Sequence, residues 1–262
     1  MATWVVQANM LSKDRLQDVA WALRELEIPL VGVNVIPFSD ELEFLFDAPL
    51  GRGIIPYGST SLVKHAQKHN WSGLFFPKAN FQVPVWNQNR DDMLNNDADV
   101  MTVKEASVKF STKEKRELWF IRPVEDLKAF SGTVTTAEEI SRWMSSIDGG
   151  NFQIFEDTMV AISQPKTILA EWRWFVVGGK VIDGSMYHHN GALYKKHETD
   201  NAVIHEAQTL ADKWLPHETV VMDIALTNYG PQVIEFNCLN GSGFYDHDIR
   251  KIVRAVTDYV DK

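Results

Sequence analysis

The chain lacks several features that mark secreted and membrane-embedded proteins. It has a single cysteine, Cys238, among 262 residues, so no disulfide can form within it. It contains no run of about 18 apolar residues, and hence no predicted membrane-spanning helix. Its first residues, MATWVVQANMLSKDRLQ, have neither a basic lead nor a long apolar stretch, so we expect no signal peptide. Together these absences predict a cytoplasmic protein.

Positive charge is also scarce. Lysine and arginine number 26 against 35 aspartate and glutamate, which gives a net charge of -9 and a pI near 5.4. This balance argues against broad, nonspecific binding to nucleic acid or to an anionic membrane, although it leaves room for a local basic groove. Hydrophobic residues make up 45% and charged residues 23%, as in ordinary folded proteins. The length is sufficient for one large domain or for two to three small lobes.

The first hundred residues alternate between strand-like and helix-like patterns. Strand, helix and strand with short joins are typical of a parallel βαβ unit, and Ser12 is placed to cap the first helix. We therefore predict an α/β lobe over residues 1–100. Its predicted elements are strands at residues 3–7, 30–35 and 73–76 and helices at 13–26 and 61–70, with an apolar run at 54–57.

A polar loop at residues 87–99 is the predicted lobe boundary, and the pattern changes after it. Strands in the second half are joined by short turns, Gly178-Gly179 among them, which is typical of antiparallel pairing. We predict an α+β arrangement with domains at residues 101–163 and 164–262. The predicted strands are at residues 117–122, 152–163, 168–177, 180–187, 219–226 and 231–236, and the helices at 104–110, 136–147, 205–214 and 247–260.

The stretch VIEFNCLNGSGFY, at residues 233–245, places polar side chains on an apolar strand. Glu235 and Asn237 are two residues apart, so they share one face of that strand. A short turn would bring the preceding strand, with Asp223, beside them. Two carboxylates and a carboxamide suit Mg²⁺ that also holds phosphates. The alternative is a structural ion pair between a carboxylate and a buried arginine, and the local pattern leaves both open.

Two further patterns carry charge. Glu171 and Arg173 share one face of a predicted strand, where the arginine suits a phosphate or carboxylate, but a structural salt bridge explains the pair equally well. Arg122 and Lys128 would hold a polyphosphate if they lie on adjacent strands, although such residues are usually only solvated. After the strand that ends near Tyr187, an ordinary exposed turn is favoured at His188.

The usual local signatures of phosphate binding and nucleophilic catalysis are missing. The chain has no Walker A loop and no Rossmann glycine fingerprint. It has no arrangement typical of a Ser/His/Asp or Cys/His nucleophile, and Cys238 is interpreted as a packed thiol. Chemistry that proceeds without a protein nucleophile is therefore favoured.

Taken in chain order, these pieces resemble an ATP-grasp domain over about residues 100–262, and residues 1–100 resemble the α/β lobe that precedes it in such enzymes. The run AEWRWFVVGGKVIDGSMY is similar to a smaller clade, common in phage and bacterial genomes, in which arginine replaces the first phosphate-contacting lysine. Arg122 fits that replacement. The resemblance implies an α/β lobe followed by an α+β ATP-grasp fold whose two lobes clasp ATP, in the host cytoplasm if the protein is encoded by a phage.

The same resemblance implies roles for individual residues. Arg122 and Lys128 would contact ATP phosphates, and Arg173 would steady the transferred phosphoryl group, with Lys128 and Arg173 as the catalytic cations. The remaining implied roles are the adenine edge for Val160, Ala161 and Ile162, the nucleotide for Glu171, Mg²⁺ for Asp223, Glu235 and Asn237, and the acceptor pocket for Asn240 and Ser242.

The implied activity is an ATP- and Mg²⁺-dependent, ADP-forming ligation. A carboxylate is phosphorylated by ATP, and an amine or thiol then attacks the acyl phosphate, most often forming a C–N bond. The expected partners are small-molecule or peptide carboxylates and amines, not membranes, and nucleic acid is not favoured. The alternatives are an ATP-binding module that does not ligate and another phosphoryl transferase on the same core.

Overall fold

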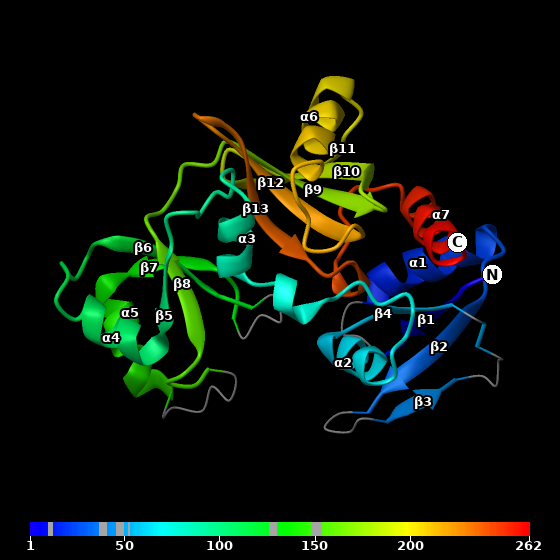
Figure 1. Cartoon of the computed structure of the whole chain (residues 1–262), viewed down its shortest axis with the longest axis horizontal. Coiled ribbons are helices and arrows are strands. Elements are labelled where there is room, and N and C mark those ends of the chain that lie inside the picture. The colour runs from blue at the N-terminus through cyan, green and yellow to red at the C-terminus, as the bar shows by residue number, and fades with distance from the viewer. Residues whose placement is uncertain (10–12, 37–40, 46–49, 52, 126–129, 148–153) are drawn as a thin grey trace. The chain divides into compact units, whose positions relative to one another are not determined.

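A computed structural model of the chain describes all residues except 10–12, 37–40, 46–49, 52, 126–129 and 148–153. The described residues form two compact units (Figure 1). The first contains residues 1–77, 170–224 and 236–262, and the second contains residues 78–169 and 225–235. The predicted domain boundaries near residues 100 and 163 stay a prediction. Each unit is described below by itself.

The first unit begins with the predicted parallel sheet. Its strand order is β3-β2-β1-β4, with β1 parallel to both β2 and β4, so the predicted βαβ unit is confirmed. The short strand β3, which the sequence pattern did not reveal, pairs antiparallel with β2. The elements are β1 (Thr3–Gln7), α1 (Lys13–Glu25), β2 (Leu30–Val35), β3 (Leu42–Phe44), β4 (Ile54–Tyr57) and α2 (Thr60–Lys68).

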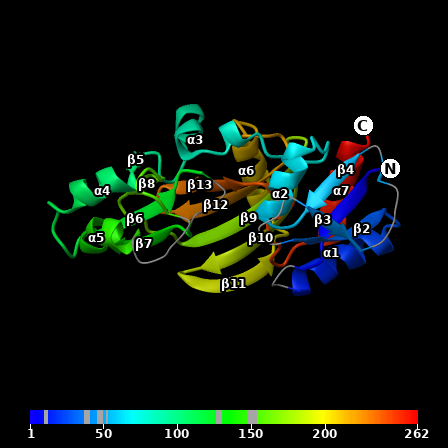
Figure 2. The same ribbon diagram turned by 90° about the horizontal axis from the view of Figure 1, so that it is seen from below.

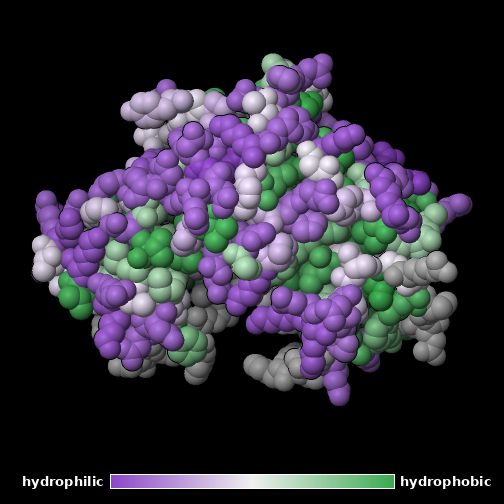
Figure 3. Space-filling view, viewed as in Figure 1, coloured by the Kyte–Doolittle hydropathy of each residue, from purple (hydrophilic) through white to green (hydrophobic). Residues whose placement is uncertain are grey.

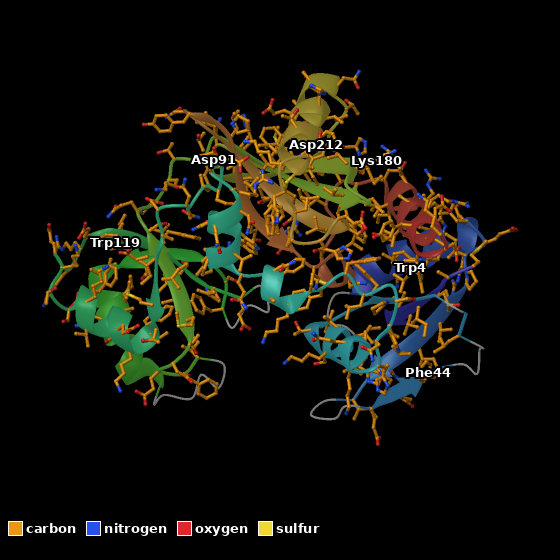
Figure 4. All side chains as sticks on the ribbon, viewed as in Figure 1. Trp4, Phe44, Asp91, Trp119, Lys180 and Asp212 are labelled. Atoms are coloured by element: carbon orange, nitrogen blue, oxygen red, sulfur yellow. The ribbon has the colours of Figure 1, made fainter. Side chains whose placement is uncertain are left out.

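Strand alternation sends successive side chains of this sheet into two cores. Val5, Val31 and Val33 pack with Leu62 of α2 on one face. Trp4, labelled in Figure 4, faces the other core and donates its indole N–H to Thr257 Oγ1 at 2.9 Å. That second core contains α1 and the C-terminal helix α7 (Ile249–Val260), so the two ends of the chain are fastened to the same sheet.

Helix α2 is amphipathic and lies over the sheet with one face. Leu62, Val63 and Ala66 are buried, and Figure 3 shows hydrophilic side chains over the outward face. The strand predicted after it, at residues 73–76, is wrong. There the main chain bonds to a side chain instead of to a strand, because Phe75 N donates to Asn240 Oδ1 at 2.8 Å.

The second sheet has the order β11-β10-β9-β12-β13, and Figure 2 shows β9, β10 and β11 side by side. The predicted hairpin between β9 and β10 is confirmed, with Gly178 and Gly179 at φ +57° and +74° in its turn. The segment predicted as a turn after Tyr187 is instead the end of β10 and the strand β11. The elements are β9 (Ala170–Val177), β10 (Lys180–His189), β11 (Ala192–His197), β12 (Val220–Thr227) and β13 (Gly230–Asn237).

Two helices complete the first unit around this sheet. Helix α6 (Asn201–Ala211) starts four residues earlier than predicted, because Asp200 caps it by accepting from Ala202 N. The short 3₁₀ helix η2 (Leu239–Gly241) follows β13 directly. No helix in the described part of the chain is long and apolar enough to cross a membrane.

The second unit is built on the sheet β5-β8-β6-β7, against which α4 and α5 pack through Val103, Ile121 and Ile140. Thr136 caps α5 as predicted, and hydrogen bonds from Thr135 and Thr136 lower the pKa of Glu139 to about 2. The polar segment predicted as a loop at 87–99 contains the end of α3 instead. The elements are η1 (Lys78–Asn80), α3 (Val83–Asn89), β5 (Asp99–Thr102), α4 (Val103–Phe110), β6 (Leu118–Pro123), β7 (Thr133–Thr136), α5 (Ala137–Ile147) and β8 (Met159–Ser163).

Candidate active site

Arg173 and Asp223 form a bidentate ion pair in the first unit. Arg173 Nε donates to Asp223 Oδ1 at 2.8 Å, and Nη2 donates to Oδ2 at 2.7 Å. The two side chains are 12% and 3% exposed. Such a planar fork fixes the orientation of the guanidinium as well as its position. Burial by itself lowers the pKa of Arg173, but the charge of Asp223 and its hydrogen bonds reverse this and raise it, so the arginine stays charged.

Three other groups complete the surroundings of this pair. Asn237 Nδ2 donates to Asp223 Oδ2 at 3.2 Å, which brings two of the three predicted metal ligands together. Arg173 Nη1 donates to the carbonyl of Gly243 at 3.2 Å, and its guanidinium carbon lies 5.1 Å from the ring centroid of Tyr245. The predicted partners of Arg173 therefore lie around it, together with a loop that the sequence pattern did not predict.

His247 fastens that loop to the strand. Tyr245 N donates to His247 Nδ1 at 2.9 Å, and the Nε2 of the same ring lies 3.2 Å from the carbonyl of Arg173. Burial lowers the pKa of His247 to about 4, so the ring is neutral at pH 7. A neutral ring that accepts at Nδ1 donates from Nε2, and both bonds are then satisfied.

Glu171 lies two positions before Arg173, on the same face of β9. It accepts from the hydroxyl of Tyr187 at 2.8 Å and lies 3.1 Å from His188 Nδ1. Tyr187 also stacks on Tyr245, with ring centroids 4.7 Å apart. Burial, followed by the charges of Asp223 and Glu171, raises the pKa of Tyr187, so its phenol keeps its proton.

Arg122 is the corresponding cation of the second unit. Its Nη2 lies 2.9 Å from Glu235 Oε2, with side-chain exposures of 7% and 17%. The guanidinium carbon lies 5.2 Å from the ring centroid of Trp86. On the neighbouring strand Arg122 is directly opposite Ala161, so the two predicted nucleotide-binding segments of this unit are adjacent.

Val160, Ala161 and Ile162 are buried in the central part of the second unit's sheet. Strand β8 pairs with β5 on one side and with β6 on the other. Two ladders use the main-chain groups of an inner strand, so a contact between these residues and the edge of adenine stays a prediction. Lys128, the other predicted phosphate contact, lies outside the described residues.

Asn240 and Ser242 are buried beneath the loop that follows β13. Asn240 Nδ2 donates to the carbonyls of Pro56 and Gly73, each at 2.8 Å, and its Oδ1 accepts from Phe75 N. Ser242 Oγ donates to the carbonyl of Cys238 at 2.7 Å. These bonds use the polar atoms of both side chains to hold the loop, so any part in acceptor binding would be one of position, not of direct contact.

The predicted metal ligands are all oxygen donors, and both carboxylates have an arginine partner. Among the described residues, no group of three or more histidine, cysteine, aspartate or glutamate side chains is arranged to hold a metal ion. The proposed set is different in kind, since it contains two carboxylates and one carboxamide. A carboxylate has roughly four acceptor sites, so one guanidinium partner does not exclude a cation. The donor chemistry therefore fits Mg²⁺.

A sequence profile of an ATP-grasp domain family, described as family 2 of its clade, matches residues 98–255. The matched segment contains Arg122, Arg173, Asp223 and the Glu235-Phe236-Asn237 run. The chain belongs to this ATP-grasp family. No curated protein sequence matches the chain at the threshold applied.

Solved ATP-grasp structures resemble the whole chain in fold. The RimK domain ATP-grasp protein from Sphaerobacter thermophilus is 14% identical, with a TM-score of 0.62 over 99% of both chains. D-alanine–D-alanine ligase from Bacillus anthracis is 11% identical, with a TM-score of 0.59 over 100% of this chain and 96% of the other. The ATP-grasp ligase PsnB, complexed with minimal precursor, is 12% identical, with a TM-score of 0.57 over 99% of both. The predicted ATP-grasp fold is confirmed.

Family membership supports ATP-dependent ligase activity of the general ATP-grasp kind. The replacement of a lysine by Arg122 and the origin in a phage stay predictions. Sequence reasoning missed the residues that surround the ATP-grasp arginines, namely Trp86, Tyr187, Gly243, Tyr245 and His247. No local signal marked them, because each contacts an arginine from another strand or loop.

Proposed function

We propose that the protein is an ATP- and Mg²⁺-dependent, ADP-forming ligase that joins a carboxylate to an amine or a thiol through an acyl phosphate. The observation that carries this proposal is the buried cluster of Arg173, Asp223 and Asn237 within the ATP-grasp segment. A fixed cation beside oxygen donors suits a reaction in which charge develops on a phosphoryl group.

Each cation has a proposed task in the first step. Arg122 and Lys128 would bind the phosphates of ATP, beside the adenine segment of Val160 to Ile162, and Glu171 would face the nucleotide. Arg173 would stabilise the phosphoryl group while it moves to the substrate carboxylate. Its orientation is held by Asp223, so little reorganisation is needed during the reaction.

Mg²⁺ would be held by Asp223, Glu235 and Asn237. When bound, it would neutralise charge on the phosphates and orient them. In support, PsnB has been solved in complex with Mg and ADP. The two arginines that now contact the carboxylates would share them with the cation or turn to the phosphates, and both alternatives keep the site close to neutral.

The acceptor would lie near the loop from residue 238 to 248, which Asn240, Ser242 and His247 hold in place. The related solved structures include a D-alanine–D-alanine ligase, a D-cycloserine synthetase and a complex of PsnB with a precursor peptide. Both amino acids and peptides therefore belong in a first substrate screen. An amine is proposed ahead of a thiol because an amide is the usual product of this mechanism.

The test is a product screen with the full chain, ATP and Mg²⁺. Amino acids, short peptides and a small-molecule extract of cells are supplied together, and ADP, phosphate and a condensed product are sought by mass spectrometry. We expect equal amounts of ADP and product, and their loss in Arg173→Met. Formation of AMP would refute the acyl-phosphate route. Binding of ATP without any product would favour the non-ligating ATP-binding module instead.

A further inference from the structure

A β-bulge in β10 brings two side chains to the same carboxylate. The register of β10 shifts between Met186 and His188 against both β9 and β11. Bulges redirect side chains and are frequent beside active sites. Here both Tyr187 and His188 reach Glu171, one to each carboxylate oxygen, at 2.8 and 3.1 Å.

The hydrogen bonds at Glu171 decide which nitrogen of His188 is available. The raised pKa of Tyr187 keeps its phenol protonated, so it donates to Glu171 Oε2. A carboxylate offers only acceptors, and His188 Nδ1 therefore carries the hydrogen toward Oε1. In the neutral ring Nε2 then keeps its lone pair. A carboxylate that orients an imidazole in this way also stabilises the imidazolium that forms when the ring takes up a proton.

The neighbouring imidazoles do not have this freedom. Both ring nitrogens of His247 are used, by Tyr245 N and the carbonyl of Arg173. His197 has Nδ1 at 3.2 Å from the carbonyl of Asp246 and Nε2 at 3.7 Å from Asp183 Oδ1. The side chain of His188, by contrast, is 40% exposed and can be reached by a substrate.

His188 also lies beside the proposed phosphoryl site. Its carboxylate partner, Glu171, and Arg173 share one face of β9. The ring of Tyr187 lies 6.0 Å from the guanidinium carbon of Arg173 and 5.3 Å from the ring of His188. A nucleophile that approaches an acyl phosphate held at Arg173 from this side would pass the imidazole.

We propose that His188, oriented by Glu171, is the general base of the second step, an inference that rests on the proposed ligase activity. The nitrogen of the amine attacks the acyl carbon and forms the C–N bond. The bond between that carbon and the phosphate oxygen breaks, and phosphate leaves with the electron pair. The proton lost by the attacking nitrogen passes to His188 Nε2, and from there to solvent.

Hydroxylamine separates this role from a structural one. It is an uncharged nucleophile at neutral pH and attacks acyl phosphates without a base. The full chain and His188→Gln are each incubated with ATP, Mg²⁺ and the carboxylate and amine found in the product screen, and again with hydroxylamine replacing the amine. We expect His188→Gln to form the natural product about 10²- to 10⁴-fold more slowly, and to form the hydroxamate at the rate of the unaltered protein.

The matched control is His189→Gln, the adjacent exposed histidine of the same strand, which we expect to ligate normally. Equal melting temperatures for the two variants would exclude a folding defect. The inference is overturned if His188→Gln ligates the amine at the normal rate, or if it loses hydroxamate and natural product to the same extent. If the unaltered protein forms the hydroxamate but not the amide with any amine, the base assignment fails while acyl-phosphate chemistry stands. If it forms neither, the proposed function fails first.

Discussion

Arg173 in the first unit and Arg122 in the second each face a carboxylate, but they are held differently. Arg173 makes two parallel bonds to Asp223 and a third to the carbonyl of Gly243. Arg122 makes one ionic contact to Glu235, which is 17% exposed against 3% for Asp223. The first arginine is locked in one orientation, and the second is held mainly by a single contact and the face of Trp86.

This difference suggests a division of labour. A guanidinium with a buried bidentate partner loses much if it changes partner, whereas one with a more exposed partner exchanges it at lower cost. Arg122 is therefore suited to capture the phosphates of an arriving nucleotide, and Arg173 to remain in place during the reaction. The substitutions below test that contrast, beginning with the largest expected effect.

Removal of the buried carboxylate should have the greatest effect on stability. Asp223→Ala leaves the Arg173 charge buried without its partner, and we expect the free energy of unfolding to fall by about 3–5 kcal/mol. Glu235→Ala, the matched change in the second unit, should cost only about 1–3 kcal/mol, because its carboxylate is more exposed. Urea denaturation of the two variants measures both. Equal losses would remove the distinction between the pairs.

The second prediction concerns the histidine that fastens the loop over Arg173. The pKa of His247 is lowered from 6.5 to about 4 in the folded protein by burial. Between these values the unfolded chain binds a proton that the folded chain does not, so stability falls as the pH is lowered through this window. The slope is up to about 1.4 kcal/mol per pH unit.

Other groups also titrate in this range, since burial lowers the pKa of His217 and raises that of Asp183. The informative quantity is therefore the difference between the unaltered protein and His247→Gln, measured by thermal unfolding from pH 4 to pH 8. We expect the variant to have the flatter profile. Parallel profiles would show that His247 is not held neutral.

Local sequence patterns predicted most of the helices and strands but few of the contacts between them. The β1–α1–β2 unit and the hairpin at Gly178-Gly179 were correct because periodicity and turn residues are local signals. The strand predicted at 73–76 failed because its main-chain partner is a side chain 165 positions away, at Asn240. Nothing in the apolar residues of that segment reveals a partner so distant.

The candidate site shows the same limit. Asp223 and Asn237 were correctly expected to lie together, since a short turn connects their strands. The Arg173–Asp223 pair spans 50 positions, and either a metal or an arginine partner for the carboxylate was consistent with the sequence. The bulge at Tyr187, which brings His188 to Glu171, depends on two neighbouring strands at once and has no signature in the sequence of β10 alone.

The third prediction tests the more loosely held arginine. Arg122→Ala should weaken ATP binding about 10- to 100-fold, which corresponds to the loss of one charge-assisted contact to phosphate. Isothermal titration calorimetry measures the affinity, with Arg142→Ala, an exposed arginine of α5, as the control that should bind normally. An unchanged affinity would remove Arg122 from the nucleotide site and leave it as a structural partner of Glu235.

The smallest expected effect concerns the aromatic face beneath Arg173. Tyr245 lies 5.1 Å from the guanidinium carbon and stacks on Tyr187, so its ring supports an arginine that Asp223 already orients. Tyr245→Leu should cost about 0.5–2 kcal/mol of stability through the lost cation–π contact, and Tyr245→Phe much less, since the ring is kept. Thermal unfolding of both variants measures the difference. A loss in the leucine variant as large as that in Asp223→Ala would mean that the ring, and not the carboxylate, does most to hold Arg173, and the contrast with Arg122 would then rest on Tyr245 and Trp86 instead of on the two acids.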